Sequence, residues 1–275
     1  MLLAADCQID RRTFNKFRRI IYERSGIKLG ERKEALVVAR VGKRMRALGI
    51  TDHREYLKYV IEDATEGELV RLLDAVSTNV TSFFREAEHF AFLQDTVSGW
   101  VRNGMRRLRI WSAACSSGEE PYSIAIALRE AVGQAPMNMR ILATDISTEV
   151  LEQARSRVYV EERIKPVSAQ LRARYFDRVD RPEGVCYRVK PQLAEMVVLK
   201  RLNLSITPFP MRGPLDVVFC RNVMIYFDRL LRQRLLEEIY RLLRTDGYLL
   251  VGHAESLTGV SNAFRAVRPS IYLKS

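Results

Sequence analysis

The sequence predicts an α/β protein with a mostly parallel sheet, preceded by an all-helical domain and interrupted by a small antiparallel β-subdomain. Three patterns lead to this prediction. From residue 108 onward, short apolar runs alternate with segments of helical periodicity, which is typical of a parallel sheet covered by helices. Residues 1–76 show helical periodicity alone. A turn at 179–184, with a short apolar run on each side, indicates the inserted antiparallel strands.

The N-terminal domain is predicted from helical spacing and from helix start signals. Phe17 and Ile21 lie on one face of a first helix, which ends at Gly26. Two capping-box patterns, Asp52-x-x-Glu55 and Thr65-x-x-Glu68, indicate the starts of two later helices. We expect the apolar residues of these helices to form a core, so any function would belong to their basic residues.

A polar segment at 77–90 is predicted to join this domain to the sheet domain, which then spans 91–275, with the β-subdomain at about 178–200. The segment is rich in small polar residues, yet too β-branched for a flexible linker. We expect Phe83 and Phe84 to anchor it.

The elements of the sheet domain follow from its apolar runs. We expect strands at Leu108–Ser112, Met139–Thr144, Leu215–Cys220 and Tyr248–Gly252, and helices at Pro121–Ala131, Glu149–Arg155 and Leu230–Arg244. Phe264–Lys274 suits an antiparallel strand that closes the sheet. Cys186–Val189 and Met196–Leu199 are expected to form the inserted antiparallel sheet.

Composition limits the class of protein. The chain has 275 residues, 47% of them hydrophobic and 28% charged, as in a globular protein. No apolar run approaches the ~18–20 residues that span a bilayer, and Met1–Ala5 is too short for a signal peptide. The four cysteines include no C-x-x-C pair and there are three histidines, which argues against a zinc site and a disulfide framework. We therefore expect a cytoplasmic protein without a metal.

Positive charge is concentrated near the N-terminus. The formal net charge is +12, and between Arg11 and Arg46 thirteen basic residues face three acidic ones. So large a local excess of positive charge predicts an acidic partner. Nucleic acid, an anionic membrane and an acidic protein surface all fit this charge.

The segment Trp111–Ile126 is the strongest functional signal. It predicts a buried strand, a loop of small residues and a helix with Pro121 in its first turn, the arrangement that holds nucleotide-like ligands in open α/β sheets. Glu119 and Glu120 stand where a phosphate-binding loop would have a lysine, and neither glycine-rich phosphate motif is present. The loop therefore suits a cationic, phosphate-free nucleoside such as S-adenosylmethionine.

Asp145 is the second acidic signal. It ends the predicted second strand, 25 residues after Glu120, where an acid accepts hydrogen bonds from ribose hydroxyls. Asp145 would instead cap the following helix if it had no ligand. The spacing from the loop favours the ribose role.

The chain resembles the chemotaxis receptor glutamate O-methyltransferases of the CheR family over Thr13–Tyr272. The similar motifs are Thr78-Asn-Val-Thr-Ser-Phe-Phe-Arg-Glu86, Trp111–Ser123, Ala143-Thr-Asp-Ile146, Asn203-Leu204 and Cys220-Arg-Asn-Val-Met-Ile-Tyr-Phe227. The resemblance implies a Rossmann-like, class I S-adenosylmethionine-dependent methyltransferase sheet, an all-helical N-terminal domain and a three-stranded inserted subdomain.

The resemblance also implies the site residues. Those expected to bind the cofactor are Asn79, Thr81, Arg85, Glu120, Asp145, Asn203, Leu204, Arg221 and Asn222. Arg85 and Tyr226 resemble the residues beside the reacting methyl group and are the predicted catalytic residues. On the sequence alone, Arg85 would equally pair with Glu86 or Glu88, and Tyr226 would be a core aromatic.

The implied reaction is methyl transfer from S-adenosylmethionine to glutamate carboxylates of a chemoreceptor's cytoplasmic helices, giving methyl esters and S-adenosylhomocysteine. The basic residues Arg40, Lys43, Arg44 and Arg46 are expected to dock on those Glu-rich helices. In some relatives a C-terminal receptor peptide adds a strand to the inserted subdomain, and the sequence leaves open whether it does so here. The receptor, its target residues and the oligomeric state also stay open.

Two other functions remain to be weighed. The basic end suggests a nucleic-acid methyltransferase, but Arg221-Asn222-Val223-Met224 stands where an amino-directed enzyme needs an Asn/Asp-Pro-Pro-aromatic motif, and Cys220 lacks the preceding proline usual for cytosine chemistry. A binding module that docks without turnover would not need Arg85 and Tyr226 beside the acidic pair. A dehydrogenase is disfavoured because the glycine fingerprint is absent.

Overall fold

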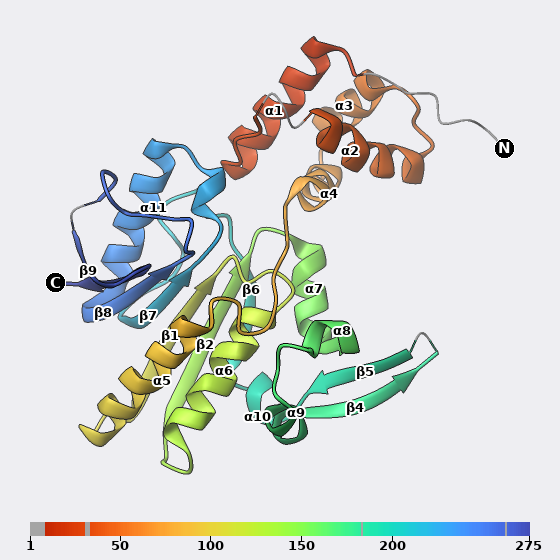
Figure 1. Cartoon of the computed structure of the whole chain (residues 1–275). Coiled ribbons are helices and arrows are strands. Elements are labelled where there is room, and N and C mark those ends of the chain that lie inside the picture. The colour runs from red at the N-terminus through yellow and green to blue at the C-terminus, as the bar shows by residue number, and fades with distance from the viewer. Residues whose placement is uncertain (1–8, 31–33, 183, 262) are drawn as a thin grey trace.

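The computed structural model describes residues 9–30, 34–182, 184–261 and 263–275. Met1–Ala5 lies outside the described residues, as do Arg32 and Lys33 of the basic segment. The first helices are α1 (Arg11–Ser25), α2 (Glu34–Leu48), α3 (His53–Glu62) and α4 (Gly67–Val76). Figure 1 shows them as a group beyond the carboxyl ends of the strands, joined to the sheet domain by an extended segment.

The helical domain has its own core. Phe17, Ile21, Val41, Tyr56 and Leu72 are all fully buried, and they come from all four helices. Each of these apolar positions repeats at helical spacing, so burial on one face stabilises helices that would be marginal alone.

Of the two predicted capping boxes, the one at Thr65-x-x-Glu68 is wrong. Asp52 caps α3 by accepting a hydrogen bond from the backbone N–H of Arg54, as predicted. At α4, however, Glu68 does not reach back to Thr65: its carboxylate is buried and binds Arg44 and Tyr56. The backbone N–H of Glu68 instead donates to the carboxylate of Asp63 at 2.7 Å, while the Glu68 side chain joins α4 to α2 and α3.

The main sheet has the strand order β6-β2-β1-β7-β8-β10-β9. Its strands are β1 (Arg107–Ala113), β2 (Asn138–Asp145), β6 (Val197–Arg201), β7 (Leu215–Cys220), β8 (Leu243–Val251), β9 (Phe264–Arg268) and β10 (Ile271–Lys274). The first five are parallel, and β10 and β9 are antiparallel. The parallel sheet with an antiparallel closure is confirmed, although the closing segment is a hairpin and not one strand.

Helices cover both faces of this sheet (Figure 1). They are α5 (Ala87–Arg102), α6 (Glu119–Val132), α7 (Thr148–Ser156) and α11 (Arg229–Leu242). On one face Ile110 packs in a cluster with residues of α5 and α6, and on the other Trp111 packs with residues of α11. Because successive strand residues point to opposite faces, a continuous apolar run supplies both layers.

The inserted subdomain is a sheet of order β3-β5-β4, formed by β3 (Val158–Val160), β4 (Phe176–Arg181) and β5 (Gly184–Val189). Three short helices accompany it: α8 (Glu161–Ile164), α9 (Ala169–Tyr175) and α10 (Pro191–Ala194).

The predicted place of Met196–Leu199 in this small sheet, and the range of about 178–200, are wrong. β6 pairs in parallel with β2 at the edge of the main sheet, and the small sheet lies between residues 158 and 189. An edge strand alternates in burial much as an antiparallel strand does, while β3 is only three residues long and gives no periodic signal.

Over the described residues, no helix combines the length and apolarity needed to cross a membrane.

Candidate functional site

A pocket that is open to solvent lies where the parallel strands end. It is lined by the segment 77–85, by the loops after β1, β2, β6 and β7, and by Ser25 and Ile27 at the end of α1. Ligands of open α/β sheets bind at this edge. All ten predicted site residues line it: Asn79, Thr81, Arg85, Glu120, Asp145, Asn203, Leu204, Arg221, Asn222 and Tyr226.

The loop between β1 and α6 brings backbone close to this pocket. Ala114 and Ser116 have left-handed φ values of +67° and +48°, and Gly118 has φ +99°. A Cβ atom on Gly118 would lie 2.6 Å from the hydroxyl of Tyr159, so the loop requires glycine there. Strained backbone of this kind is retained where a precise shape serves a site.

Asp145 ties this loop to the next strand. One oxygen accepts a hydrogen bond from the backbone N–H of Ser116 at 2.9 Å, and the other from Ser147 at 3.0 Å. The cap of α7 is Ser147, whose side chain accepts from Val150, so Asp145 is not that cap. Burial raises the pKa of Asp145, and the two backbone donors oppose the rise.

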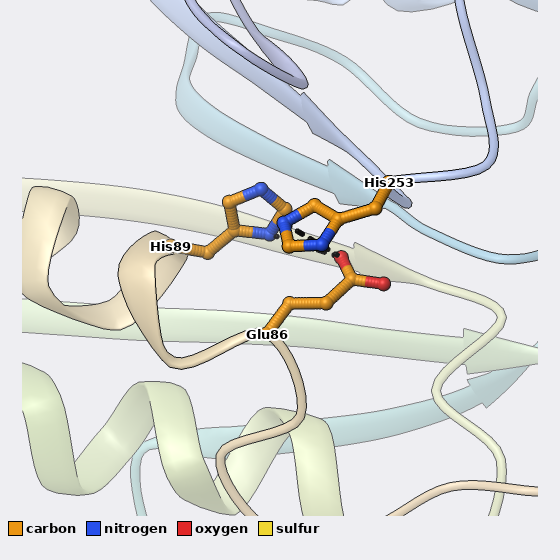
Figure 2. A group of neighbouring side chains, drawn as sticks. All are labelled: Glu86, His89 and His253. Atoms are coloured by element: carbon orange, nitrogen blue, oxygen red, sulfur yellow. Dashed lines mark ion pairs between the residues drawn. The ribbon is translucent and has the colours of Figure 1, made fainter.

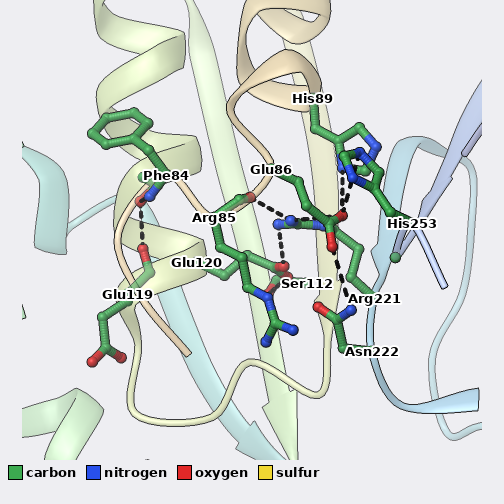
Figure 3. Close-up of polar contacts among 12 residues, drawn as sticks. Phe84, Arg85, Glu86, His89, Ser112, Glu119, Glu120, Arg221, Asn222 and His253 are labelled. Carbon is green, nitrogen blue, oxygen red and sulfur yellow. Dashed lines mark hydrogen bonds and ion pairs between the residues drawn. The ribbon is translucent and has the colours of Figure 1, made fainter. Parts of the chain in front are cut away.

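Glu120 lies at the base of the pocket, in contact with strand residues (Figure 3). It accepts a hydrogen bond from Ser112 at 2.7 Å and pairs with Arg221 at 3.0 Å. Burial raises its pKa, while the Arg221 charge and the Ser112 hydrogen bond lower it. Such a carboxylate retains acceptor positions for a cationic or amino group.

Glu119, the other loop carboxylate, is not among the described residues that line the pocket. It is fully buried, pairs with Arg163 at 2.6 Å and accepts from the hydroxyl of Ser117. Its contacts hold the start of α6 against α8, so it serves the fold and not the pocket.

Arg221 connects the linker to the sheet. It is 5% exposed, and its guanidinium pairs with Glu86 at 3.0 Å as well as with Glu120. It also donates to the backbone carbonyl of Arg85. Asn222, with φ +58°, donates to the other oxygen of Glu86 at 3.4 Å. These contacts position the linker over the ends of β1 and β7 (Figure 3).

The two predicted catalytic residues lie in the same pocket. Arg85 is half-buried and donates to the carbonyl of Val80 at 2.9 Å, while Glu86 pairs with Arg221 and not with Arg85. Tyr226 is also half-buried, on the 3-10 helix η2 (Met224–Tyr226), so it is not a core aromatic.

Part of the pocket lining is apolar. Leu204 is buried, and Ile27 and Ile146 line the same pocket. Asn203 donates to the carbonyl of Arg24 at 2.7 Å, which joins the loop after β6 to the end of α1. A flat base such as adenine fits between apolar side chains of this kind.

Sequence reasoning missed Glu255. This carboxylate is 7% exposed and accepts from the backbone N–H groups of Asn222 and Gly252 at 2.7 Å each, and from Ile225 at 3.3 Å. It thereby fixes the loop that carries Asn222 and Tyr226. Its position just after β8, at the ligand-binding edge of the sheet, was the available signal.

Glu86, His89 and His253 form a further cluster, with ligand-type atoms within 4.8 Å of one another (Figure 2). His89 is 1% exposed, its ring nitrogens lack a hydrogen-bond partner among the described residues, and burial lowers its pKa to about 4. A metal ion here would have to share the Glu86 oxygen that already pairs with Arg221. We therefore assign the cluster to the support of Arg221.

The donor set fits S-adenosylmethionine. Two buried carboxylates, Glu120 and Asp145, face one pocket, and no lysine lines it among the described residues. Of the two arginines that line it, Arg221 is already paired with Glu120 and Glu86. Acidic groups favour a sulfonium and an amino group and repel a pyrophosphate. The chemistry therefore agrees with a cationic nucleoside.

Comparison with known proteins identifies both parts of the chain. Residues 12–77 match the CheR methyltransferase all-alpha domain, and residues 79–273 match the CheR methyltransferase SAM-binding domain. The chain is 40% identical to the chemotaxis protein methyltransferase of Escherichia coli, over 95% of this chain and 90% of that protein. It is 41% identical to chemotaxis protein methyltransferase 2 of Pseudomonas aeruginosa, over 95% and 92%.

These matches span both domains, and the carboxylate pocket lies in the part that matches the cofactor-binding domain. The chain belongs to the CheR methyltransferase family and is an S-adenosylmethionine-dependent methyltransferase.

Proposed function

We propose that this enzyme transfers the methyl group of S-adenosylmethionine to glutamate side chains on the cytoplasmic helices of a chemoreceptor. The products are glutamate methyl esters and S-adenosylhomocysteine. The observation that carries the proposal is the placement of Arg85 and Tyr226 in the same pocket as Glu120 and Asp145. The names of the similar proteins support the chemotactic role.

The pocket suits a carboxylate as the acceptor. When bound, S-adenosylmethionine supplies an electrophilic methyl group on a positively charged sulfur. A glutamate is already ionised at neutral pH, with a reference pKa of about 4.3, so it needs no general base. In agreement, no histidine lines the pocket among the described residues.

Arg85 and Tyr226 then act by positioning. Arg85 uses one N–H on Val80 and keeps others with which to hold one oxygen of the substrate carboxylate. The other oxygen is left to attack in line, at about 3 Å. Tyr226 lines the space beside it and orients the acceptor. A tight ion pair would weaken the nucleophile, so Arg85 serves orientation more than neutralisation.

The cofactor contacts are proposed from the same geometry. Asp145 accepts hydrogen bonds from the ribose hydroxyls. Glu120 and Arg221 bind the methionine end of the cofactor, and Asn203 and Leu204 lie beside the adenine. The linker contributes Asn79 and Thr81, and the carbonyl of Asn79 already accepts a hydrogen bond from Ser116 at 3.0 Å.

Of the four basic residues expected to dock on the receptor from α2, two remain available for that contact. Arg40 donates to the carbonyls of Val76 and Ser77, and Arg44 pairs with buried Glu68, so both are engaged within the helical domain. Lys43 and Arg46 are exposed and remain the residues of α2 that would meet an acidic receptor helix.

The experiment is transfer of labelled methyl from S-adenosylmethionine to a purified receptor cytoplasmic fragment, measured as methanol released by base. We expect base-labile label that disappears when the methylated glutamates of the fragment are replaced by alanine. Base-stable label, or label in nucleic acid, would contradict the proposal and favour the other methyltransferase class. Cofactor binding without transfer would favour a binding module.

A further inference from the structure

A second recess opens beside the cofactor pocket and shares Tyr226 and Phe227 with it. Its cationic lining comes from Lys28, after α1, and from Arg229 and Arg232 on α11. A third recess continues from Lys28 along α1. We call the two recesses together the basic trough, defined by Arg18, Arg19, Lys28, Arg229 and Arg232.

The trough is fixed relative to the reaction site. The backbone N–H of Lys28 donates to the carbonyl of Tyr226 at 2.9 Å, and Arg232 donates to the carbonyl of Phe227 at 2.9 Å. Gly26 also packs against α11, because a Cβ atom there would lie 2.3 Å from Leu231. The cations are therefore held beside the segment that carries Tyr226.

The charge of the trough is one-sided. Among the described residues that line it, Asp228 is the only carboxylate. That group already accepts hydrogen bonds from Tyr22 and from the backbone of Leu231, and these contacts, with the nearby charge of Lys28, lower its pKa. Asp228 thus stays ionised but offsets only one of five positive charges. Three of the five side chains each donate one hydrogen bond to a backbone carbonyl, Arg18 to Leu29, Arg229 to Gly259 and Arg232 to Phe227, and keep their charge. Lys28 is exposed, and Arg19 makes only a 3.9 Å contact with Glu23.

Apolar side chains accompany the cations. Ile225 is 45% exposed in the recess beside the pocket, and Tyr22 is 41% exposed in the other. A concave surface with both features fits a helix that has an acidic face and some apolar residues. Sequence-tolerant binding of single-stranded nucleic acid needs a series of aromatic side chains on which bases stack. Among the described residues of the trough, two aromatic side chains, Tyr22 and Tyr226, are at least partly exposed, which is too few for such a series.

We propose that the basic trough binds the acidic face of the receptor helix that carries the target glutamate. Residues three and four apart on a helix lie about 5–6 Å from one another. A carboxylate one or two turns from the target therefore reaches Lys28, and those further along reach Arg19, while the target enters between Arg85 and Tyr226. This assignment rests on the proposed function, and it places a substrate contact on α1 and α11 in addition to the exposed Lys43 and Arg46 of α2.

The test compares two double charge reversals that change the net charge equally. Arg19→Glu with Lys28→Glu alters the trough. Arg102→Glu with Arg107→Glu alters two exposed residues, the last of α5 and the first of β1, at the end of the parallel strands opposite the pocket. Binding of a fluorescent receptor cytoplasmic fragment is measured by anisotropy, S-adenosylhomocysteine binding by calorimetry, and KM for the fragment by methyl transfer.

We expect the trough variant to bind the fragment at least tenfold more weakly, with a matching rise in KM, and the control to change less than twofold. Affinity for S-adenosylhomocysteine stays within twofold in both, which also shows that the variants are folded. A milder pair, Arg19→Gln with Lys28→Gln, is expected to weaken binding about threefold.

Equal weakening in both reversals would overturn the proposal, because net charge would then explain the effect. Unchanged binding in the trough variant would overturn it as well, as would trough-dependent binding of an oligonucleotide or of anionic vesicles in place of the fragment. If the wild type binds the fragment through the trough but transfers no methyl, the proposed function fails and the docking site stands. If methyl transfer is normal in the trough variant, the docking site alone fails.

Discussion

At the scale of single residues, Asp145 joins two tasks in one carboxylate. Its oxygens organise the loop after β1 through Ser116 and the start of α7 through Ser147, and the same group faces the pocket. Because it is buried, its pKa is raised, so its ionised form is lost at a higher pH than for an ordinary aspartate.

We expect cofactor affinity to fall on acidification because of this shift. The ionised carboxylate accepts hydrogen bonds from the ribose hydroxyls. The affinity for the cofactor is therefore highest at neutral pH and falls as the pH drops through the raised pKa of Asp145. Asp145→Asn should weaken S-adenosylhomocysteine binding about tenfold or more at pH 7 and flatten its pH dependence. Calorimetry between pH 5 and 8 measures both.

Glu120, whose pKa is also raised, provides the comparison. A pH dependence that survives in full in Asp145→Asn would assign the titration to Glu120, and the expectation for Asp145 would then be wrong. Glu120→Gln tests that assignment directly.

At the scale of elements, the loop after β7 depends on one carboxylate from another loop. Glu255 accepts three backbone hydrogen bonds from this region, two of them from the loop that bears Asn222 and Tyr226. We expect Glu255→Gln to lower the free energy of unfolding by about 1–3 kcal/mol, since an amide leaves a buried N–H unpaired.

The same variant should lower kcat about tenfold, because Tyr226 and Asn222 lose their fixed position. Glu237→Gln, on the exposed side of α11, is the control and should change neither quantity. Unchanged turnover in a folded Glu255→Gln enzyme would show that the loop is held by its other contacts.

The ion pair between α2 and α4 gives a second prediction at this scale. Glu68 is 3% exposed and bound to Arg44, so removing the arginine leaves a buried charge. We expect Arg44→Met to destabilise the enzyme by about 3 kcal/mol, and Lys43→Met, next to it and exposed, to have almost no effect. Thermal unfolding measures both; equal stabilities would show that Arg44 is free to serve docking.

The elements also show what the sequence can and cannot predict. Strands such as Leu215–Cys220 are buried on both faces, so their continuous apolar runs are unambiguous. The segment of β6 was assigned to the wrong sheet because the strand with which an edge strand pairs cannot be read from its own sequence. The edge of β4 stays open in the small sheet, and whether a receptor peptide pairs there stays a prediction.

The pocket was predicted better than its supports. Asp145 and Glu120 follow strands at distances that indicate a ligand site. The support from Glu86 depends on a contact with Arg221, which lies more than 100 residues away in the sequence. The support from Glu255 depends on contacts with Asn222 and Ile225, 33 and 30 residues away. No periodicity or spacing encodes such contacts. The hydrogen bonds from Arg40 to the carbonyls of Val76 and Ser77 and the ion pair of Arg44 with Glu68 were hidden for the same reason.

At the scale of the whole molecule, the pocket is shared between the two domains. Ser25 and Ile27 come from the helical domain, and the remaining wall comes from the linker and the sheet domain. A ligand that bridges both should stabilise both. With S-adenosylhomocysteine at 100 times its Kd, we expect about 2.7 kcal/mol of added stability.

Hydrogen exchange locates that stabilisation. We expect slower exchange in α1 and in the loop after β7 when the ligand is bound, and no change in the β4–β5 hairpin, which lies away from the pocket (Figure 1). Protection confined to residues 87–275 would show that the helical domain does not respond to the ligand.

The close contact of Gly26 with α11 has a consequence for how such enzymes evolve new specificity. The family boundary falls between residues 77 and 79, yet the turn at Ser25–Ile27 helps to complete the pocket from the other side of it. The two modules are therefore not interchangeable parts. A chimera that borrows a relative's helical domain to acquire a new receptor will keep turnover only if the donor brings a turn that fits the host's α11. New specificity would arise more readily by altering charges on the helices than by recombining whole domains.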